Sequence, residues 1–340
     1  MSMKILVVAN MYPTPAKPHF GTFVKACVDG YKLQGVDTEV AVIKGSGAKA
    51  YLALYFSVFF KCLFGKYDYV HVHYVTHSVP PVYLARLFKR FKILLNFHGS
   101  DAFPEAYETE IRKKLKRKIC QLALKKSHAA IVPSEYFKNK LSGSYELQNV
   151  IVSPSGGVDN SLFKYKAASG RTVMFAGRMI EEKGPVLAAK AIKRNIEQID
   201  RVIMVGDGPE LSRVKQILKG IEVEYHGMLP REELAKKMTE ADVFLFPSTR
   251  EGESLGLVLV EAVFSGCIPL AVLNGAVKEI LTNALEVELI TTTNRFSVSL
   301  GALLAEANNF SQYSAALYKS TEHKYSFEPV AKELVGSLVK

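Results

Sequence analysis

Short apolar runs alternate with stretches of helical periodicity along the chain. The first run, KILVVANMYP at 4–13, ends in proline-rich turn chemistry. Gly21 then precedes a stretch in which Phe23, Cys27 and Tyr31 recur every four residues, and a second apolar run, DTEVAVIK, follows. Strand, glycine turn, helix and strand make one βαβ unit, which predicts a parallel sheet.

The same rhythm continues through the rest of the chain. We expect further strands within 67–74, 92–101, 129–141, 172–178, 201–210, 223–229, 241–248 and 267–273, the last of which closes the sheet core. A final helix is expected at 325–340. The pattern predicts an α/β fold with two Rossmann-like doubly wound domains that face a cleft, where an active site would lie.

Length and charge place the boundary between these domains. A chain of 340 residues exceeds the size at which one hydrophobic core stops growing. The segment 150–159, VIVSPSGGVD, has the Pro, Ser and Gly composition of a linker. Residues 1–155 hold 22 Lys+Arg and 10 Asp+Glu, whereas residues 156–340 hold 22 and 23. We therefore expect domains at 1–155 and 156–325, with the helix 326–340 packing back toward the N-terminal domain.

The positive charge of the N-terminal half favours an anionic surface or polymer as its partner. Within it, the segment 108–126 carries eight Lys/Arg and an apolar helical stripe at positions 111, 115, 119 and 122. Such a helix suits a membrane surface or a polyanion, although any charged face can simply be solvated. Residues 51–64 are strongly apolar but too short to span a bilayer, which needs about 20 residues. A buried helix and a helix in the bilayer interface both remain open for this segment.

Composition limits the other function classes. The hydrophobic content of 48% and charged content of 23% are those of an ordinary globular protein, and the start of the chain reads as a first strand rather than a signal peptide. Four widely separated cysteines without a CxxC pair favour a reducing cytosol and no structural zinc. His71, His73 and His77 invite a metal hypothesis, but no Cys or carboxylate completes the set nearby in sequence, so no metal site is predicted.

The candidate chemistry centres on Pro247–Pro269, where Glu253 and Glu261 stand eight residues apart. A helix that begins near Gly256 leaves its first amides without intrahelical partners, and these form an anion site. Two carboxylates beside an anion site suit a sugar attached to phosphates. An amphipathic helix after a solvated acidic loop is the structural alternative. His98 ends another predicted strand, at the sheet edge where such folds bind ligands.

Eight motifs in order along the chain resemble the retaining GT-B glycosyltransferases of family 4. They are FGTFVKA, HGSD, VPSEYF, GGVD, GRMIEEKG, GDGPE, HGMLPREEL and ESLGLVLVEA. The family's pair of glutamates, E-x7-E, falls on Glu253 and Glu261. The usual glycine after the first glutamate is Ser254 here, and Glu251 followed by glycine offers a competing register. Which glutamate contacts the sugar stays open.

The resemblance implies roles for individual residues in a C-terminal nucleotide-sugar domain and an N-terminal acceptor domain. Arg178 and Lys183 would hold the diphosphate, and Glu261 would bind the ribose. Glu253 would bind the transferred sugar, and the backbone near Met228 would touch the base. The remaining implied donor-side residues are Gly21, Gly206, Gly256, Leu257 and Val258, with His98 near the reacting carbon and Asp101 supporting it on the acceptor side. His98, Glu253, Arg178 and Lys183 form the implied catalytic set.

The sequence thus predicts a retaining glycosyltransferase that moves a sugar from a UDP- or GDP-sugar to a glycan or lipid-linked acceptor. No Asp-x-Asp motif is present, so no metal or other cofactor is expected. The expected location is the cytoplasm or, peripherally, the cytoplasmic face of a membrane. A nucleotide-sugar epimerase or hydrolase of the same fold is the nearer alternative. A polyanion-binding protein is a weaker one, because the phosphate-type residues lie in the neutral half, and no nucleic-acid partner is expected.

Overall fold

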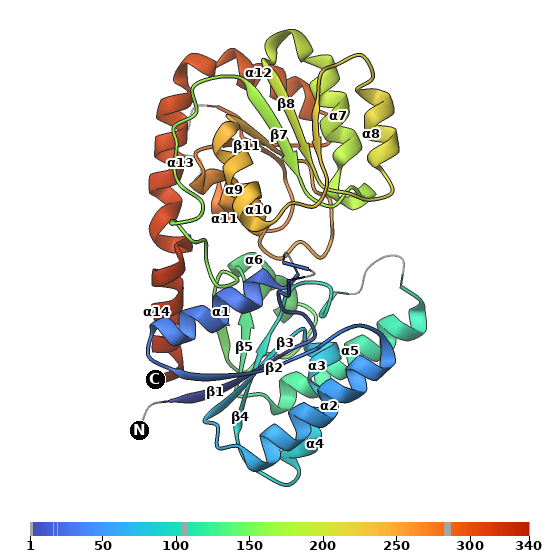
Figure 1. Cartoon of the computed structure of the whole chain (residues 1–340), viewed down its shortest axis with the longest axis vertical. Coiled ribbons are helices and arrows are strands. Elements are labelled where there is room, and N and C mark those ends of the chain that lie inside the picture. The colour runs from blue at the N-terminus through green and yellow to red at the C-terminus, as the bar shows by residue number, and fades with distance from the viewer. Residues whose placement is uncertain (1–2, 16, 19, 104–107, 282–286, 340) are drawn as a thin grey trace. The chain divides into compact units, whose positions relative to one another are not determined.

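Two parallel six-stranded sheets covered by helices organise the chain (Figure 1). The computed structural model describes residues 3–15, 17–18, 20–103, 108–281 and 287–339. The N-terminal unit holds the chain up to Gly157 together with the last helix from Phe327, and the C-terminal unit runs Val158–Ser326. The predicted α/β class with two parallel sheets is confirmed.

The sheet of the N-terminal unit has the strand order β2-β1-β3-β4-β5-β6, with every pair parallel. Its strands are β1 Lys4–Ala9, β2 Asp37–Val42, β3 Tyr69–His73, β4 Lys92–Asn96, β5 Ala129–Val132 and β6 Val150–Val152. Its helices are α1 Thr22–Leu33, α2 Gly47–Phe64, α3 Val75–Ser78, α4 Pro80–Arg86, α5 Glu110–Lys126, α6 Glu135–Ser142 and α14 Phe327–Val339.

Both faces of this sheet are buried, which explains the continuous apolar runs in its sequence. Successive residues of β1 alternate between two cores: Leu6 and Val8 pack with side chains of α2, α4 and α5, whereas Ile5 and Val7 pack with α1 and α14. All four of these β1 side chains are fully buried. Polar chemistry is therefore largely confined to the strand ends and loops.

The sheet of the C-terminal unit has the order β12-β11-β10-β7-β8-β9, again all parallel. Its strands are β7 Thr172–Ala176, β8 Arg201–Val205, β9 Glu224–His226, β10 Val243–Phe246, β11 Ile268–Val272 and β12 Ile290–Thr291. Its α-helices are α7 Pro185–Arg194, α8 Leu211–Ile217, α9 Arg231–Glu240, α10 Leu257–Phe264, α11 Val277–Ile280, α12 Phe296–Ala305 and α13 Phe310–Tyr325. The 3₁₀ turns are η1 Glu181–Lys183, η2 Ile196–Gln198 and η3 Ala307–Asn309.

Three expectations from the sequence need correction. The segment 150–159 is not all linker, because its first three residues form β6 and pair with β5. The strand at 267–273 is not the last strand of the second sheet, since β12, which was not predicted, pairs beyond it at the edge. The apolar segment 51–64 belongs to a longer helix, α2, that begins at Gly47. The short strand β12 and the added turns of α2 lack the long apolar periodicity that sequence reasoning detects.

The last helix, α14, packs on α1 within the N-terminal unit. A Cβ atom added at Gly30 of α1 would lie 2.9 Å from the Cβ of Ala331 in α14, so the two helices approach closely where Gly30 has no side chain. At the far end of α14, the Tyr69 hydroxyl of β3 donates a 2.7 Å hydrogen bond to the carbonyl of Leu338. These contacts attach the end of the chain to the first domain's core.

By length and composition alone, one helix among the described residues, Gly47–Phe64, could cross a membrane. One stripe of this helix, which includes Leu54, Val58 and Cys62, is buried in the core of the N-terminal unit. The helix therefore belongs to the folded domain.

We predict opposite effects for alanine at two helical glycines. Gly30→Ala forces α14 away from α1 and should lower the free energy of unfolding by about 1–3 kcal/mol. Gly336→Ala lies in α14 where nothing stands within 4 Å of the added atom. It should raise the free energy of unfolding by about 0.5–1 kcal/mol, because alanine loses less backbone entropy in a helix. Urea unfolding of both variants is the measurement, and a Gly30→Ala protein as stable as the wild type would contradict the close packing.

Candidate active site

The carboxyl ends of the central strands of the C-terminal unit bring four loops together. A Cβ atom at Gly206, after β8, would lie 1.9 Å from the carbonyl oxygen of Gly177, after β7, so only glycine allows this backbone contact. The loop after β7 is also tied to the loop after β10, since Thr249 N–H donates to Glu182 O at 2.8 Å. Asn274, after β11, donates to the carbonyl of Arg250 at 2.9 Å. This is the edge where parallel α/β sheets bind ligands.

A buried ion pair lies at this edge. Lys183 Nζ, at the end of η1, donates to Glu253 Oε2 at 2.5 Å, and Ser248 Oγ donates to the same oxygen at 2.9 Å. The Glu253 side chain is only 8% exposed and that of Lys183 is 16% exposed. Burial alone would raise the pKa of Glu253, but the charge and hydrogen bond of Lys183, with help from Arg250 and Ser248, hold it below its usual value. Glu253 is therefore ionised at neutral pH.

The second glutamate of the pair has a cation of its own. Glu261, in α10, is 5% exposed, and Arg231 Nη2 at the start of α9 lies 2.8 Å from its Oε1. Burial raises the pKa of Glu261 despite the opposing charge of Arg231. Arg231 also lies over the ring of Phe163, with its guanidinium carbon 5.0 Å from the ring centroid. The two carboxylates thus sit in different electrostatic environments.

The start of α10 has the geometry expected of an anion site. Gly256 takes a left-handed conformation with φ 82°, and no side chain caps the helix. The amides of Leu257 and Val258 belong to the first turn, where an α-helix leaves its N–H groups without intrahelical partners. The helix begins at Leu257, shortly after Glu253 in the chain, and the partial positive charge of its N-terminus would favour an anion there.

The remaining predicted residues of this unit are exposed. Arg178 extends from the loop after β7, and Met228 is 48% exposed in the loop before α9. Glu251, the competing first glutamate, is also exposed, whereas Glu253 is buried against Lys183. The geometry therefore favours Glu253 as the glutamate of the pair that belongs to the site, while the roles of these residues stay predictions.

In the N-terminal unit, a second group of predicted residues forms around His98. Asp101 is fully buried, and its Oδ1 accepts hydrogen bonds from the amides of His98 and Gly99, both at 3.0 Å. Its Oδ2 accepts from the amide of Val75 at 3.3 Å, so it joins the ends of β3 and β4. Burial raises the pKa of Asp101, and these backbone hydrogen bonds oppose the rise. Asp101 therefore holds the loop of His98 from a fully buried position, and its place on the acceptor side stays a prediction.

The ring of His98 is held from several sides. Its Nε2 lies 3.0 Å from Nδ1 of His73, and one of these nitrogens donates to the other. Its ring stacks near Phe23 and Tyr74, with centroid separations of 4.4 and 5.3 Å. Tyr74 takes a left-handed conformation with φ 56°, which is strained for a residue other than glycine. Burial lowers the pKa of His98, so its imidazole is neutral at pH 7.

Gly21 lies at the start of α1 in a left-handed conformation, φ 75°. A Cβ atom there would lie 2.8 Å from the carbonyl carbon of Met11, so the glycine lets the loop before α1 pack on the chain that follows β1. The tight-turn role of this glycine is thus established by its geometry, and its predicted approach to phosphates remains a prediction.

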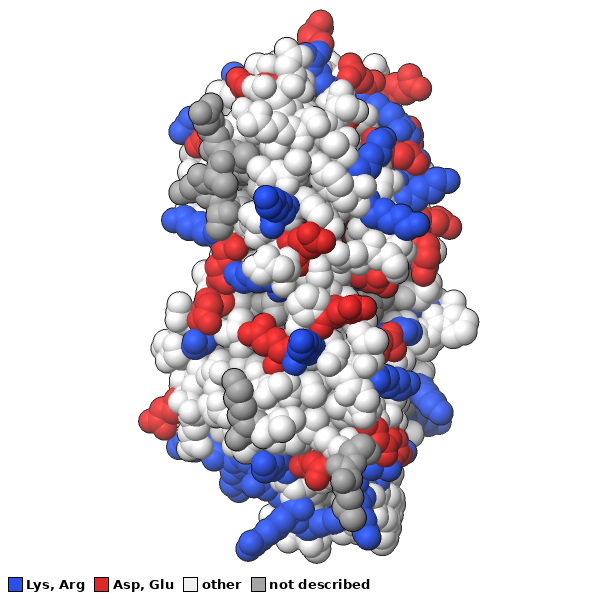
Figure 2. Space-filling model, turned by 90° about the vertical axis from the view of Figure 1, so that its left-hand side faces the viewer, with Lys and Arg blue, Asp and Glu red and all other residues white. Residues whose placement is uncertain are grey.

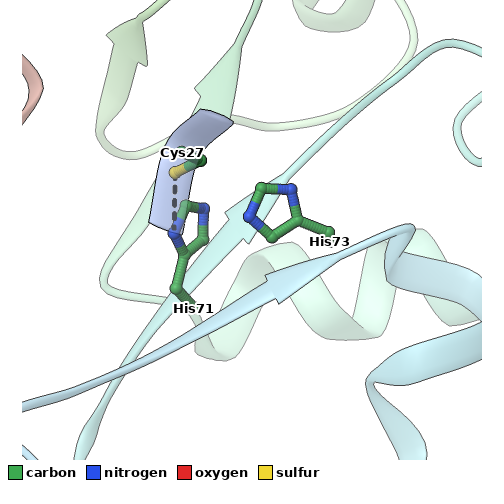
Figure 3. A group of neighbouring side chains, drawn as sticks. All are labelled: Cys27, His71 and His73. Carbon is green, nitrogen blue, oxygen red and sulfur yellow. Dashed lines mark hydrogen bonds between the residues drawn. The ribbon is translucent and has the colours of Figure 1, made fainter. Parts of the chain in front are cut away.

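The histidines of β3 gain a cysteine neighbour that the sequence did not reveal. Cys27 of α1, His71 and His73 offer ligand atoms within 4.8 Å of one another (Figure 3). The fold brings α1 onto β3, so a cysteine that is distant in sequence lies beside two of the three histidines. His77 is not part of this group.

The three side chains pack as neutral groups. The Tyr31 hydroxyl lies 2.9 Å from His71 Nδ1, burial raises the pKa of the Cys27 thiol to about 12, and burial lowers the pKa of His71 to about 3. The Cys27 thiol is therefore protonated and the Tyr31 hydroxyl contacts His71, so these side chains form a packed polar cluster. The expectation that no metal binds here stays a prediction.

Sequence reasoning missed Arg231, Ser248 and His73 as members of these groups. Arg231 stands inside the quoted motif HGMLPREEL, but nothing along the chain pairs it with Glu261, thirty positions further on. His73 shares a strand face with His71, a pattern that was considered only for metal binding. Ser248 lies two residues after β10, at the start of the glutamate loop, and this position is the one local signal that could have drawn attention to it.

Two family models match the chain. The model described as "Glycosyltransferase Family 4" covers residues 7–160, and the one described as "Glycosyl transferases group 1" covers residues 170–307. Together they account for most of both units.

Among curated relatives, the chain is 32% identical over 109 residues to the sulfoquinovosyl transferase SQD2 of Arabidopsis thaliana, covering 32% of this chain and 21% of that protein. It is 21% identical over 230 residues to N-acetyl-alpha-D-glucosaminyl L-malate synthase of Bacillus anthracis, covering 63% and 58%. It is 24% identical over 213 residues to the putative teichuronic acid biosynthesis glycosyltransferase TuaC of Bacillus subtilis, covering 58% and 50%. The matches thus span between 21% and 58% of these relatives' lengths.

Solved structures share the fold over nearly the whole chain. Sucrose-phosphate synthase from Thermosynechococcus elongatus superposes with a TM-score of 0.80 at 17% identity, covering 100% of this chain and 98% of that one. Anabaena HepE in complex with UDP and glucose gives 0.77 at 14% identity, covering 99% of each. At these identities the likeness establishes the GT-B fold alone.

The buried histidines predict how stability depends on pH. His71 and His73 have lowered pKa values in the folded state, so below about pH 6.5 the unfolded state binds more protons than the folded one. The free energy of unfolding should therefore fall as the pH drops from 7 to 5, with a slope that steepens below about pH 6.5 toward about 1.4 kcal/mol per pH unit for each histidine. Urea unfolding at several pH values measures this slope.

The variant His71→Asn should reduce the slope by about one proton. Its matched control is His323→Asn, since His323 is exposed on α13. An equal slope in the His71 variant and the wild type would contradict a neutral, buried His71.

Proposed function

The chain belongs to the family 4 glycosyltransferases and is an enzyme of the GT-B type, and from this premise we propose that it transfers a sugar from a nucleotide-sugar donor with retention of anomeric configuration and without a metal ion. The observation that carries this proposal is the buried pair of Lys183 and Glu253 at the carboxyl edge of the second sheet. The pair places a fixed cation and an ionised carboxylate within one hydrogen bond of each other.

The cation would act on the leaving group. Cleavage of the sugar–phosphate bond places negative charge on the departing diphosphate, and a positioned cation stabilises that charge more strongly in the transition state than in the bound donor. Lys183 would shift from Glu253 to the diphosphate, with Arg178 and the first amides of α10 adding positive potential. Many glycosyltransferases hold a metal for this purpose with Asp-x-Asp, a motif that this sequence lacks.

The carboxylates would hold hydroxyl groups. An ionised carboxylate only accepts hydrogen bonds, so Glu253, once released by Lys183, would accept from hydroxyls of the transferred sugar. Glu261, fixed by Arg231, would accept from the ribose. His98 would contact the sugar near the reacting carbon as a neutral imidazole, positioned by His73. Retention follows the family's same-face attack, which needs no separate protein base.

The donor is proposed to be a UDP- or GDP-sugar. Anabaena HepE, which shares this fold, has been solved with UDP-glucose, and this supports a nucleotide sugar as the donor class. The acceptor is proposed to be a glycan or a lipid-linked acceptor, since relatives by name include a teichuronic acid glycosyltransferase and a sulfoquinovosyl transferase. The proposed location is the cytoplasm or, peripherally, the cytoplasmic face of a membrane. Thermal-shift screening against UDP-, GDP- and ADP-sugars would identify the donor, with a shift expected for one nucleotide class.

The loss of Lys183 should slow transfer. Lys183→Ala should reduce turnover with the identified donor by at least about tenfold, equivalent to roughly 1.4 kcal/mol of transition-state stabilisation. Lys237→Ala is a matched control, because Lys237 also forms ion pairs in the C-terminal unit, with Glu224 and Glu240, away from the loop edge. Both variants are assayed below their unfolding temperatures, since removal of Lys183 leaves Glu253 buried without its cation. An unchanged rate in Lys183→Ala would remove this residue from the mechanism.

Metal independence has its own test. Turnover of donor and acceptor should be the same in excess EDTA as in its absence. Activity that disappears in EDTA and returns with Mg²⁺ or Mn²⁺ would show that a metal, and not Lys183 with Arg178, neutralises the diphosphate.

A nucleotide-sugar epimerase or hydrolase of the same fold is the competing function. It would use the same donor residues but need no acceptor. Product analysis after incubation with the donor alone separates the two: a transferase leaves most of the donor intact, whereas an epimerised or hydrolysed sugar would favour the alternative.

A further inference from the structure

The exposed hydrophobic side chains of this protein are unevenly distributed. More than half of the large exposed ones among the described residues lie on α2, on α4 with the turn after it, and on α5. These three helices pack on one face of the N-terminal sheet (Figure 1), and α4 lines one groove with α2 and another with α5. We call this surface the α2–α4–α5 face. A concentration of apolar side chains at one place on a soluble domain marks an interaction surface.

The helix α2 is apolar on two sides. One stripe, at Ala50, Leu54, Val58 and Cys62, is buried in the core. A second stripe points outward, and its side chains are between 49% and 74% exposed: Leu52, Phe56, Phe60 and Phe64. A surface helix of a water-soluble domain ordinarily has polar residues in this position, so the outward stripe has no role in the domain's own core.

The middle of the face is formed by α4 and two shallow grooves. One groove, of about 360 Å³, lies between α2 and α4 and has almost entirely apolar walls that include Phe56, Phe60 and Leu84. The other, of about 800 Å³, lies between α4 and α5. Pro80 and Leu84 line both grooves, so the apolar surface continues from one to the other. Leu87 and Phe88, just after α4, are 75% and 69% exposed.

The helix α5 adds charge beside this apolar surface. The apolar stripe noted in its sequence points mostly outward, since Ile111, Leu115 and Leu122 are 80%, 57% and 54% exposed. The side of α5 that packs into the domain carries smaller side chains, with Cys120, Ala123 and Leu124 buried. Basic residues surround the outward stripe, and among the described residues no salt bridge engages Arg112, Lys114, Lys118, Lys125 or Lys126.

The wider charge distribution agrees with this local one. Figure 2 faces the side of the molecule on which α14 lies, not the α2–α4–α5 face; there Lys and Arg gather at the lower end, in the N-terminal unit, whereas acidic and basic side chains are mixed over much of the remaining surface. The positive charge of the whole chain, +11, resides in its first half.

We propose that the α2–α4–α5 face docks on a lipid bilayer that contains anionic lipids. Outward Phe and Leu side chains would enter the interface between headgroups and acyl chains, and the basic residues of α5 would lie against the anionic headgroups. The helix α2 does not cross the bilayer, because its other stripe is part of the domain core. A nucleic acid would match the charge but offers no apolar layer to the outward side chains.

This surface is separate from the Lys183–Glu253 site and does not depend on the proposed reaction. An enzyme held in this way would have its N-terminal unit at the membrane, where a lipid-linked acceptor is concentrated. Vesicle binding requires neither donor nor acceptor, so its outcome is independent of whether transfer is observed.

Co-flotation of the full chain with vesicles tests the proposal. The protein should float with vesicles of phosphatidylcholine and phosphatidylglycerol but not with vesicles of phosphatidylcholine alone. The double variant Phe56→Ser/Phe60→Ser should lose at least about tenfold in its partition coefficient, because two apolar side chains no longer enter the interface. Lys125→Gln/Lys126→Gln should also lose about tenfold on anionic vesicles, since each basic residue near the surface contributes to binding.

Matched control variants lie in the C-terminal unit. Val298→Ser removes an apolar side chain that is 51% exposed on α12, and Lys193→Gln/Arg194→Gln removes two basic residues at the last turn of α7, as Lys125 and Lys126 stand at the last turn of α5. Both controls should float like the wild type. Circular dichroism spectra of all variants check that they are folded.

Three results would overturn the proposal. The first is a wild-type protein that does not float with anionic vesicles. The second is a Phe56→Ser/Phe60→Ser variant that binds as well as the wild type, which would show unspecific adsorption by charge. The third is a wild-type protein that does not bind vesicles but self-associates in sedimentation experiments, with self-association lost in the Phe56→Ser/Phe60→Ser variant. The face would then be an interface between two copies of the chain.

Discussion

The constraint on which this structure depends is that both sheets are parallel and covered by helices. A parallel strand is buried on both faces, so its interior positions have to be apolar, as Ile5, Leu6, Val7 and Val8 are in β1. Functional polar groups then gather mainly where strands end and loops begin. In the C-terminal unit this principle brings Lys183, from the loop after β7, to the edge where Ser248 and Glu253 lie in the loop after β10.

The strand β3 departs from this rule, and its buried polar side chains destabilise the fold. It carries His71 and His73 fully buried in its interior. Tyr31 hydrogen-bonds His71, and His98 hydrogen-bonds His73, but the Nε2 atoms of both strand histidines have no hydrogen-bond partner among the described residues. Buried polar atoms without partners destabilise a fold by about 1–3 kcal/mol each. Tyr74, the next residue after β3, has a strained backbone conformation. Several destabilising features thus lie next to His98, which is typical of a site under functional constraint.

The fold could be predicted from the sequence because its elements repeat a strong local pattern. Apolar runs gave the strands of both sheets, and βαβ order gave their parallel direction. The edge strand β12, two residues long, has no such pattern and was missed. On α5 the apolar stripe was visible, but its direction was not. The domain packs Cys120 and Ala123 inward and leaves Ile111 and Leu115 outside, and which side of a helix meets the sheet is decided by tertiary packing.

The site shows the same limit in its ion pairs. Periodicity and motifs single out Glu253, Glu261 and Lys183, but the partner of each carboxylate is set by tertiary contacts, with Lys183 at the end of η1 and Arg231 at the start of α9. The pairs have a further consequence. Lys183 and Glu253 neutralise each other while the donor is absent, so neither is a buried, unpaired charge. Under the proposed function, a nucleotide sugar presents a diphosphate to the lysine and hydroxyls to the glutamate at the same time. The donor would then replace one buried ion pair by two charge-assisted contacts. A free sugar or a free phosphate could contact only one of the two residues and would leave the other as a buried charge without a partner.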